Sequence, residues 1–206
     1  MTKILPASAS DLDALYAISL KTGDMGADAT ALYDDPQMIG HIYSAPYLLY
    51  SPGLCFVVED QDGVAGYIVG VADTRTFEAT LEAAWWPDLR RRYVNPADIP
   101  SADWNEDQYR ANAIHSPFII PDSIVADYPA HLHMNLLPRL QRQGWGSRLL
   151  TTWLTSARAQ GVEAVHLGAG RANEAGVRFW MKSGFQDLGI TDKTSRTIWL
   201  GQNLTS

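Results

Sequence analysis

Hydrophobic positions recur at helical spacing near the N-terminus and again in the C-terminal third of the chain. Other short runs rich in valine, isoleucine and leucine are bounded by glycine, proline or aspartate, which is typical of strands. Asp62-Gly63 stands between two such runs and predicts a hairpin turn. The pattern predicts strands at residues 3–5, 54–59, 64–71, 130–137, 164–167, 185–188 and 197–200, a turn at 47–52, and helices from a Ser10 cap to about Gly23 and at 34–43, 74–93, 106–114, 145–159 and 173–182.

The chain shows no repeat, low-complexity run or linker that would divide it. We therefore expect one domain over residues 1–206. From residue 130 the order of elements is β-α-β-α-β-β, which predicts a mixed α/β sheet with helices packed on it. Pro87 should divide the helix at 74–93, and residues 95–121 are rich in proline, aspartate and asparagine. We therefore expect the region from about 74 to 128 to be an insertion into the domain that shapes a binding pocket.

Composition narrows the class of protein. Hydrophobic residues make up 46% of the 206 positions, which is enough for a sizeable core. Cys55 is the only cysteine, so an intramolecular disulfide and a four-cysteine metal site are excluded, and a reducing, cytoplasmic compartment is expected. No run has the length and apolarity of a membrane span, so we expect no membrane partner. The oligomeric state stays open, with a homodimer among the alternatives.

Charge is unevenly distributed. The net charge of −7 disfavours a nucleic-acid partner, because such proteins gain most of their affinity by neutralising phosphates. Residues 139–182 nevertheless hold seven basic and two acidic residues, a local charge of +5. A compact basic segment in an acidic protein suits a small polyanionic ligand, although solvated helix faces produce the same distribution.

A glycine-containing turn precedes the amphipathic helix at 145–159. Residues 137–148 read LPRLQRQGWGSR. Glycine lets the backbone come close to a ligand, and a helix N-terminus offers unpaired N–H groups and the positive end of the helix dipole, which together bind phosphate. Arg142 and Arg148 add positive charge. The alternative is an ordinary helix start with two glycines in it.

These residues resemble a known family. Gln141-x-x-Gly144-x-Gly146 is similar to the acetyl-CoA motif of the GCN5-related N-acetyltransferases, Q/R-x-x-G-x-G/A. Asn173-x-x-Gly176-x-x-Phe179-Trp180-x-x-x-Gly184-Phe185 is similar to the same family's closing pattern, at its spacing. More narrowly, residues 23–28 and 128–133 resemble the acetyltransferase-like domain of O-GlcNAc hydrolases and its bacterial relatives.

The resemblance implies a mostly antiparallel mixed sheet with splayed central strands and helices on both faces, and acetyl-CoA as the cofactor. Backbone N–H groups of residues 142–147 would hold the pyrophosphate, and the strand end at 134–136 would pair with the pantetheine arm. Asn173 would hydrogen-bond that arm and Phe179 would pack on it. The cofactor contacts implied are Met134, Leu136, Gln141, Arg142, Gln143, Gly144, Trp145, Gly146, Ser147, Asn173, Phe179 and Trp180.

A second glycine-containing pattern suggests a different cofactor, NAD. Residues 168–173, GAGRAN, follow a predicted strand and open a predicted helix, which is two-thirds of the dinucleotide fingerprint. The third glycine is Asn173, and Asp187 is a poor candidate for the acidic residue that the fingerprint requires. The pattern therefore favours acetyl-CoA over NAD.

Candidate catalytic groups come from the strand at 130–137. His131, His133 and Asn135 alternate with apolar residues and so share one face of that strand. A histidine beside a thioester is a natural general base, so we take His133 or His131 for that role. The spacing to Gly144 is one residue shorter than in family members with a similar histidine pair, and a bulge would be needed to restore their face. The alternative is a pair of hydrogen-bonded or solvated strand histidines.

The acid that would protonate the departing thiolate is less clear. Trp180 stands where the family usually has a catalytic tyrosine, and its indole N–H is not a useful acid. Tyr128 is the candidate to replace that tyrosine. Two histidines without a nearby carboxylate do not make a metal site, so no metal is expected.

Two function classes follow. The first is an acetyl-CoA-dependent N-acetyltransferase that acts by direct transfer on the amine of a small molecule or a protein. The second is a catalytically weak or inactive pseudo-acetyltransferase that binds acyl-CoA as a sensor or interaction module, which the tryptophan at 180 would permit. Both classes predict cofactor binding and they differ in turnover.

Overall fold

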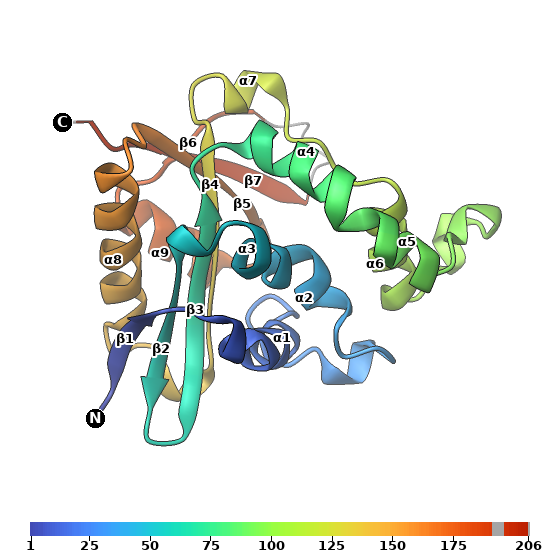
Figure 1. Ribbon diagram of the computed structural model, residues 1–206, viewed down its shortest axis with the longest axis horizontal. Coiled ribbons are helices and arrows are strands. Elements are labelled where there is room, and N and C mark those ends of the chain that lie inside the picture. The colour runs from blue at the N-terminus through green and yellow to red at the C-terminus, as the bar shows by residue number, and fades with distance from the viewer. Residues whose placement is uncertain (191–195, 206) are drawn as a thin grey trace.

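A single sheet runs through the computed structural model, which describes residues 1–190 and 196–205. In the described part its strand order is β1-β2-β3-β4-β5-β7-β6, and every neighbouring pair is antiparallel except β4 and β5 (Figure 1). This matches the predicted mixed, mostly antiparallel sheet. The strands are β1 (Lys3–Pro6), β2 (Cys55–Asp60), β3 (Gly63–Val71), β4 (Ala130–Leu136), β5 (Ala164–Gly170), β6 (Gln186–Asp187) and β7 (Thr197–Asn203).

Helices cover both faces of the sheet, as predicted. α8 and α9 pack on one face, and α1 to α6 gather on the other (Figure 1). Pro87 divides the predicted long helix into α4 and α5, because it sits in the first turn of α5 and cannot continue α4. The helices are α1 (Leu12–Lys21), α2 (Met38–Tyr43), α3 (Ala45–Tyr50), α4 (Thr74–Ala84), α5 (Trp86–Arg92), α6 (Glu106–His115), α7 (Asp122–Val125), α8 (Trp145–Ala159) and α9 (Glu174–Lys182).

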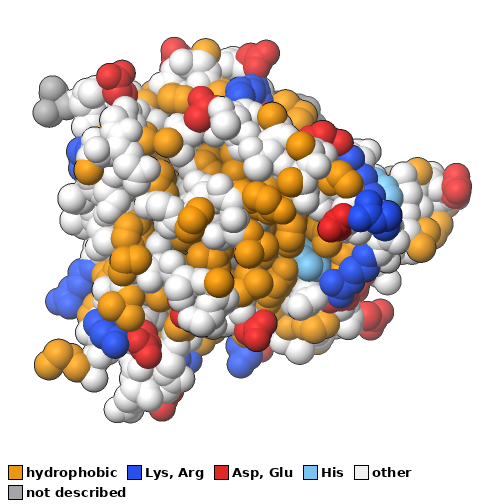
Figure 2. All heavy atoms as spheres, in the orientation of Figure 1, with side chains coloured by type: hydrophobic (Ala, Val, Ile, Leu, Met, Phe, Trp, Pro, Cys, Tyr) orange, Lys and Arg blue, Asp and Glu red, His pale blue; other side chains and the backbone are white. Residues whose placement is uncertain are grey.

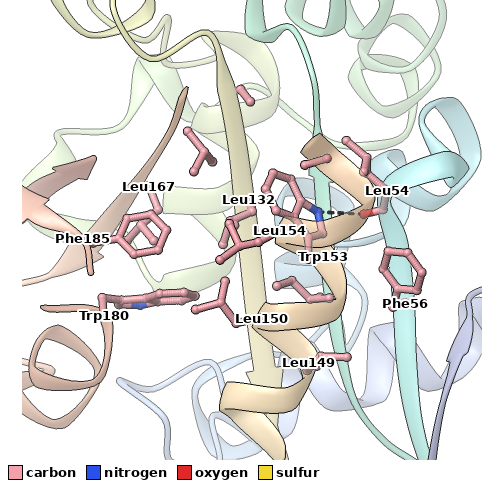
Figure 3. Close-up of a cluster of buried hydrophobic side chains, with 14 of the residues drawn as sticks. Leu54, Phe56, Leu132, Leu149, Leu150, Trp153, Leu154, Leu167, Trp180 and Phe185 are labelled. Carbon is pink, nitrogen blue, oxygen red and sulfur yellow. Dashed lines mark hydrogen bonds between the residues drawn. The ribbon is translucent and has the colours of Figure 1, made fainter. Parts of the chain in front are cut away.

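Trp153 anchors α8 against the sheet. Its indole N–H donates to the carbonyl of Leu54 at 3.0 Å, and its ring is fully buried (Figure 3). Gly70 makes room for that ring, since a Cβ there would lie 2.7 Å from Trp153 Cζ2. Trp180 of α9 packs edge-on against Phe185 in the same core. These contacts hold α8 and α9 against the sheet.

The two central strands separate soon after they meet. β4 and β5 pair only at Ala130 with Val165 and at His131 with His166. Beyond that point β4 continues along β3, while β5 continues along β7. Within the described residues, the backbone of β4 after His131 therefore has no strand partner on its β5 side. This is the splay that the family resemblance implied.

Some local features differ from the sequence-based expectations, and α2 begins at Met38 where the helix was predicted from residue 34. Residues 45–50 form α3 where a turn was predicted from residue 47, because Pro46 stands in the first turn, the one place where a helix tolerates proline. The chain before α1 forms a short 3-10 turn whose capping residue is Ser8, not Ser10; its N–H donates to Asp11. No register shift occurs in β4, so no bulge changes the face of its histidines.

The dinucleotide-like glycines lie inside a strand. β5 runs to Gly170, three residues further than predicted, so Gly168 and Gly170 pair with β7 and do not form a strand-to-helix turn. Gly168 instead accommodates Trp199, whose ring carbon Cζ3 would lie 3.0 Å from a Cβ at that position. These glycines therefore do not form the turn that would bind the phosphates of NAD, which argues against the NAD interpretation.

Candidate active site

A cleft of about 650 Å³ opens beside the splay. β4, β5 and β7 line one side of it, and α4 with residues 117–120 lines another. Leu132 and Leu167 also reach the cleft, although both belong to the core on the α8 face. The cleft therefore extends into the gap between the central strands. In Figure 2, hydrophobic side chains gather near the middle of the view, over the region where Figure 1 shows α2 and α3 beside α4.

A chain of hydrogen bonds joins the two histidines of β4. The hydroxyl oxygen of Tyr47, on α3, lies 2.8 Å from His131 Nε2 and 3.0 Å from His133 Nε2. His131 Nδ1 lies 2.8 Å from the hydroxyl of Thr74, at the start of α4. That hydroxyl lies 2.6 Å from the carbonyl oxygen of Pro129. As predicted, the histidines share one face, and three elements distant in sequence meet there.

The carbonyl at one end of this chain of hydrogen bonds can only accept, and this fixes the direction of the other bonds. The carbonyl of Pro129 only accepts, so Thr74 donates to it and accepts from Nδ1–H of His131. Neutral His131 then has an acceptor at Nε2, to which Tyr47 donates. The Tyr47 oxygen must accept from Nε2–H of His133. His133 is thereby left with an unprotonated Nδ1, which makes no hydrogen bond to a described residue and is not a fully buried atom.

Burial keeps these histidines neutral. It lowers the pKa of His133 to about 4, with a smaller contribution from His166. It also lowers the pKa of His131 well below its usual value, with contributions from His133 and His166. An imidazole that is uncharged at neutral pH has a lone pair available, and this is the state in which it can accept a proton.

The turn before α8 presents backbone N–H groups. Gly144 precedes the helix in the left-handed conformation (φ 82°), and Arg142 also has positive φ (59°). Gly144 has no side chain to cap the helix, and no described group accepts from the N–H groups of Trp145, Gly146 and Ser147. A Cβ at Gly144 would meet nothing within 4 Å, so the turn faces open space. These features fit the phosphate of a ligand.

The side chains around this turn have separate tasks. Gln141 Nε2 donates to the carbonyl of Leu136 at 2.8 Å and so fixes the end of β4 to the turn. Gln143 Nε2 donates to the carbonyl of Arg139 at 2.7 Å. The Arg148 guanidinium stacks over Trp145 at 4.8 Å. The predicted cofactor residues of this segment are therefore gathered in one place, and Arg142 is exposed there.

Residues from both motifs meet at the start of α8. A Cβ at Gly146 would lie 3.3 Å from both Leu136 and Phe179, so the small residue at this position lets β4, α8 and α9 pack closely together. Met134 packs at the edge of the adjoining core. Asn173 caps α9, where its side-chain oxygen accepts from Gly176 N–H at 2.9 Å.

Comparison with known proteins agrees with this arrangement. The model of the acetyltransferase (GNAT) family matches residues 119–185. The crystal structure of SsHAT is 33% identical, with a TM-score of 0.90 over 100% of this chain and 99% of that one. The chain belongs to the acetyltransferase (GNAT) family.

Two further matches are more distant. Protein O-GlcNAcase of Rattus norvegicus is 24% identical over 163 residues, or 77% of this chain, and the match covers only 17% of the length of that curated relative. The PaiA N-acetyltransferase from Thermoplasma acidophilum, crystallised in complex with coenzyme A, is 15% identical, with a TM-score of 0.58 over 98% of this chain and 99% of that one. The latter likeness shows the GNAT fold alone.

Two residues that the sequence singles out lie away from the cleft of this GNAT fold. Trp180 is 8% exposed and belongs to the core between α8 and α9, and it is not among the residues that line the cleft (Figure 3). The Tyr128 ring packs toward Gly201 of β7, since a Cβ at Gly201 would lie 2.7 Å from it. The Tyr128 carbonyl accepts from His166 Nδ1 at 2.6 Å. Tyr128 thus contacts the site through its backbone.

Tyr47 and His166, which line the cleft, and Thr74, which hydrogen-bonds His131 beside it, were not predicted from the sequence. His166 is 1% exposed and lines the cleft from β5. In the sequence, His166 stands out only as a polar residue in the apolar run AVHL. Its place in the site depends on the pairing of β5 with β4, which sets it opposite His131.

The described residues show no group of three or more histidine, cysteine or acidic side chains arranged to hold a metal ion. Within the same residues, no helix has both the length and the apolarity to cross a bilayer.

Proposed function

We propose that this GNAT protein transfers the acetyl group of acetyl-CoA directly to an amine. The observation that carries the proposal is the position of the splay. The unpaired edge of β4 begins at the open, N–H-rich turn before α8 and leads to the cleft that holds His133. A long ligand with phosphates at one end and a reactive group at the other fits this path.

The turn and β4 bind the two parts of acetyl-CoA. The N–H groups of residues 142–147 and the positive end of the α8 dipole hold the pyrophosphate. The free edge of β4 at Met134 and Leu136 hydrogen-bonds the pantetheine amides, as an added strand would. Asn173 and Phe179 flank that arm. These assignments carry over to this chain what the family resemblance implies, and the PaiA structure of the same fold was crystallised with coenzyme A.

His133 serves as the general base. The nitrogen of an uncharged amine attacks the thioester carbonyl, the carbon–nitrogen bond forms and the carbon–sulfur bond breaks. The attacking nitrogen becomes strongly acidic as it bonds to carbon, so a base of low pKa suffices to take its proton at Nδ1. Tyr47 and His131 orient His133 and share the resulting positive charge through their hydrogen bonds.

The thiolate of CoA leaves with the electron pair of the carbon–sulfur bond and takes a proton from solvent. Trp180 cannot supply it, and the ring of Tyr128 packs on β7. The burial of Trp180 in the core also favours a second candidate function, a non-catalytic acyl-CoA-binding module. That module would bind the cofactor at the same turn without turnover.

The test combines binding and turnover on the same sample. Purified protein is titrated calorimetrically with acetyl-CoA, with CoA and NAD as controls, and free-thiol release is then followed against a mixed panel of amines. Binding of acetyl-CoA with amine-dependent thiol release supports the transferase. Binding without release supports the acyl-CoA-binding module, and the absence of acetyl-CoA and CoA binding overturns both.

A further inference from the structure

The outer walls of the cleft are apolar and largely aromatic. Phe118, which is 67% exposed, lies parallel to Trp199 with the ring centroids 6.1 Å apart. This pair joins the segment at 117–120 to β7 across the cleft. The apolar lining on this side includes Phe77, Leu81, Trp86, Phe118, Ile120 and Trp199.

The carboxylates of the cleft are already neutralised. Glu78 pairs with Arg75 at 2.5 Å and accepts from the N–H of Ile120 at 3.0 Å. Glu82 pairs with both terminal nitrogens of Arg90, at 2.5 and 2.8 Å. Arg75 itself lines the cleft and also pairs with Asp122, whose side chain is exposed. Among the described lining residues there is no carboxylate left to receive an ammonium group.

One buried acceptor in the cleft is not satisfied by the protein. His166 Nδ1 lies 2.6 Å from the carbonyl of Tyr128, which only accepts, so Nδ1 carries the proton and Nε2 has the lone pair. His166 Nε2 is buried and has no hydrogen-bond partner among the described residues. The His166 ring lies between those of His131 and Trp199, with centroids 5.5 and 5.9 Å away. A ligand N–H that donated to Nε2 would remove the cost of this orphaned acceptor.

We infer that the acceptor of the proposed transfer is a primary amine on an apolar, ring-bearing body, bound uncharged with its N–H donated to Nε2 of His166. This inference rests on the proposed function, because it names the substrate class of the same site. It excludes polyamines and lysine side chains, which are strongly cationic, as good acceptors.

The charges around the cleft favour an uncharged amine over an ammonium ion. Moving an ammonium from water into a cleft whose carboxylates are already paired with arginines leaves its charge without a partner, which is costly. The burial that lowers the pKa of His133 to about 4 and lowers that of His166 acts in the same direction, against positive charge. An uncharged aromatic amine instead buries its ring against Trp199 and Phe118 and meets the lone pair of His166 with an N–H.

The first experiment compares two ring-bearing amines of similar size with a polyamine. Aniline is uncharged at neutral pH, benzylamine carries a similar ring with a charged amine, and spermidine is a flexible polycation. Each is titrated into the protein–CoA complex, and thiol release from acetyl-CoA is measured in parallel. We expect aniline to bind at least about tenfold more tightly than benzylamine, a free-energy difference of about 1.4 kcal/mol, and to be the best acceptor. A preference for spermidine or benzylamine, or no detectable aniline binding, overturns the inference.

A variant then tests His166. In His166→Asn the amide nitrogen can keep the hydrogen bond to the Tyr128 carbonyl while the Nε2 lone pair is lost. We expect roughly tenfold weaker aniline binding with an unchanged acetyl-CoA affinity, since one hydrogen bond is removed. His115→Asn is the control, because His115 lies on α6, its Nε2 bonds the carbonyl of Tyr93, and it does not line the cleft. Equal aniline binding by wild type and His166→Asn overturns the role of His166.

The two proposals fail in different ways. If aniline binds in a His166-dependent manner without thiol release, the transfer fails and the amine site stands. If thiol release is fastest with spermidine, the transfer stands and the inferred amine class is wrong.

Discussion

The hydroxyl oxygen of Tyr47 lies 3.0 Å from Nε2 of His133, a residue 86 positions further along the chain. The same hydroxyl donates to His131, so its oxygen can only accept from His133. This contact fixes the tautomer of His133 and leaves Nδ1 as the basic nitrogen. Tyr47 is therefore a positioning residue, which acts through His133.

Replacement of that hydroxyl tests its role. Tyr47→Phe leaves Nε2 of both histidines without a partner and frees His133 to adopt the other tautomer. We expect a loss of stability of about 1–3 kcal/mol and a fall in kcat with little change in the KM for acetyl-CoA. The pH dependence of kcat should also shift, which a purely structural role would not cause.

Tyr67→Phe is the matched control. Tyr67 is a buried tyrosine whose hydroxyl bonds Ser19 at 2.9 Å and Asn135 at 3.0 Å, away from the two histidines. Its loss should destabilise the fold to a similar degree and leave the pH profile in place. If both variants lower kcat equally with unchanged pH profiles, Tyr47 has no special role.

The phosphate turn is tested with two glycines at opposite ends of α8. Gly144 and Gly161 have φ values of 82° and 79°, and a Cβ added to either glycine would meet no atom within 4 Å. Gly144→Glu and Gly161→Glu therefore impose similar backbone strain. Only Gly144→Glu places a carboxylate where the phosphates are proposed to bind. Calorimetry should show acetyl-CoA binding lost in Gly144→Glu and kept in Gly161→Glu, and equal affinities in the two would exclude the turn as the cofactor site.

Stability should fall on acidification in a window set by the histidines. Burial lowers the pKa values of His133 and His41 to about 4 and also lowers those of His131 and His166, while unfolded histidine titrates near about 6.5. Between these values the unfolded chain binds more protons, so the free energy of unfolding decreases as pH falls from about 6.5 toward about 4. Above about 6.5 the histidines are neutral in both states and contribute no pH dependence.

Urea unfolding at about pH 7.5 and about pH 5 measures this effect above the range where most carboxylates titrate. We expect a clear loss of stability at the lower pH. His133→Asn should lose less between the two conditions because one buried histidine has been removed. A free energy of unfolding that is the same at both values would contradict neutral burial of these side chains.

Elements whose stability is local could be predicted from the sequence. α8 spans the predicted residues 145–159, because its amphipathic pattern and the glycine-containing turn before it act within the segment itself. The shared face of His131 and His133 followed from the alternation of β4. These local rules were sufficient to place the cofactor motifs.

The remainder of the site depends on tertiary pairing. The turn predicted at residues 47–52 hid Tyr47, because Ser51, Pro52 and Gly53 suggested a break that in fact comes after α3. His166 joins the cleft only through the register of β4 and β5, and Thr74 reaches His131 only because α4 starts beside Pro129. Periodicity within one segment holds no information about such contacts.

The most direct test of the account is the steady-state kinetics of His133→Ala with acetyl-CoA and an amine acceptor. A general base contributes a rate factor of roughly 10²–10⁴, so kcat should fall by about that much. The calorimetric affinity for acetyl-CoA should stay within about twofold of wild type, since the turn before α8 is untouched. A variant that keeps the wild-type kcat, or that loses acetyl-CoA affinity together with turnover, would contradict the assignment of His133 as the base.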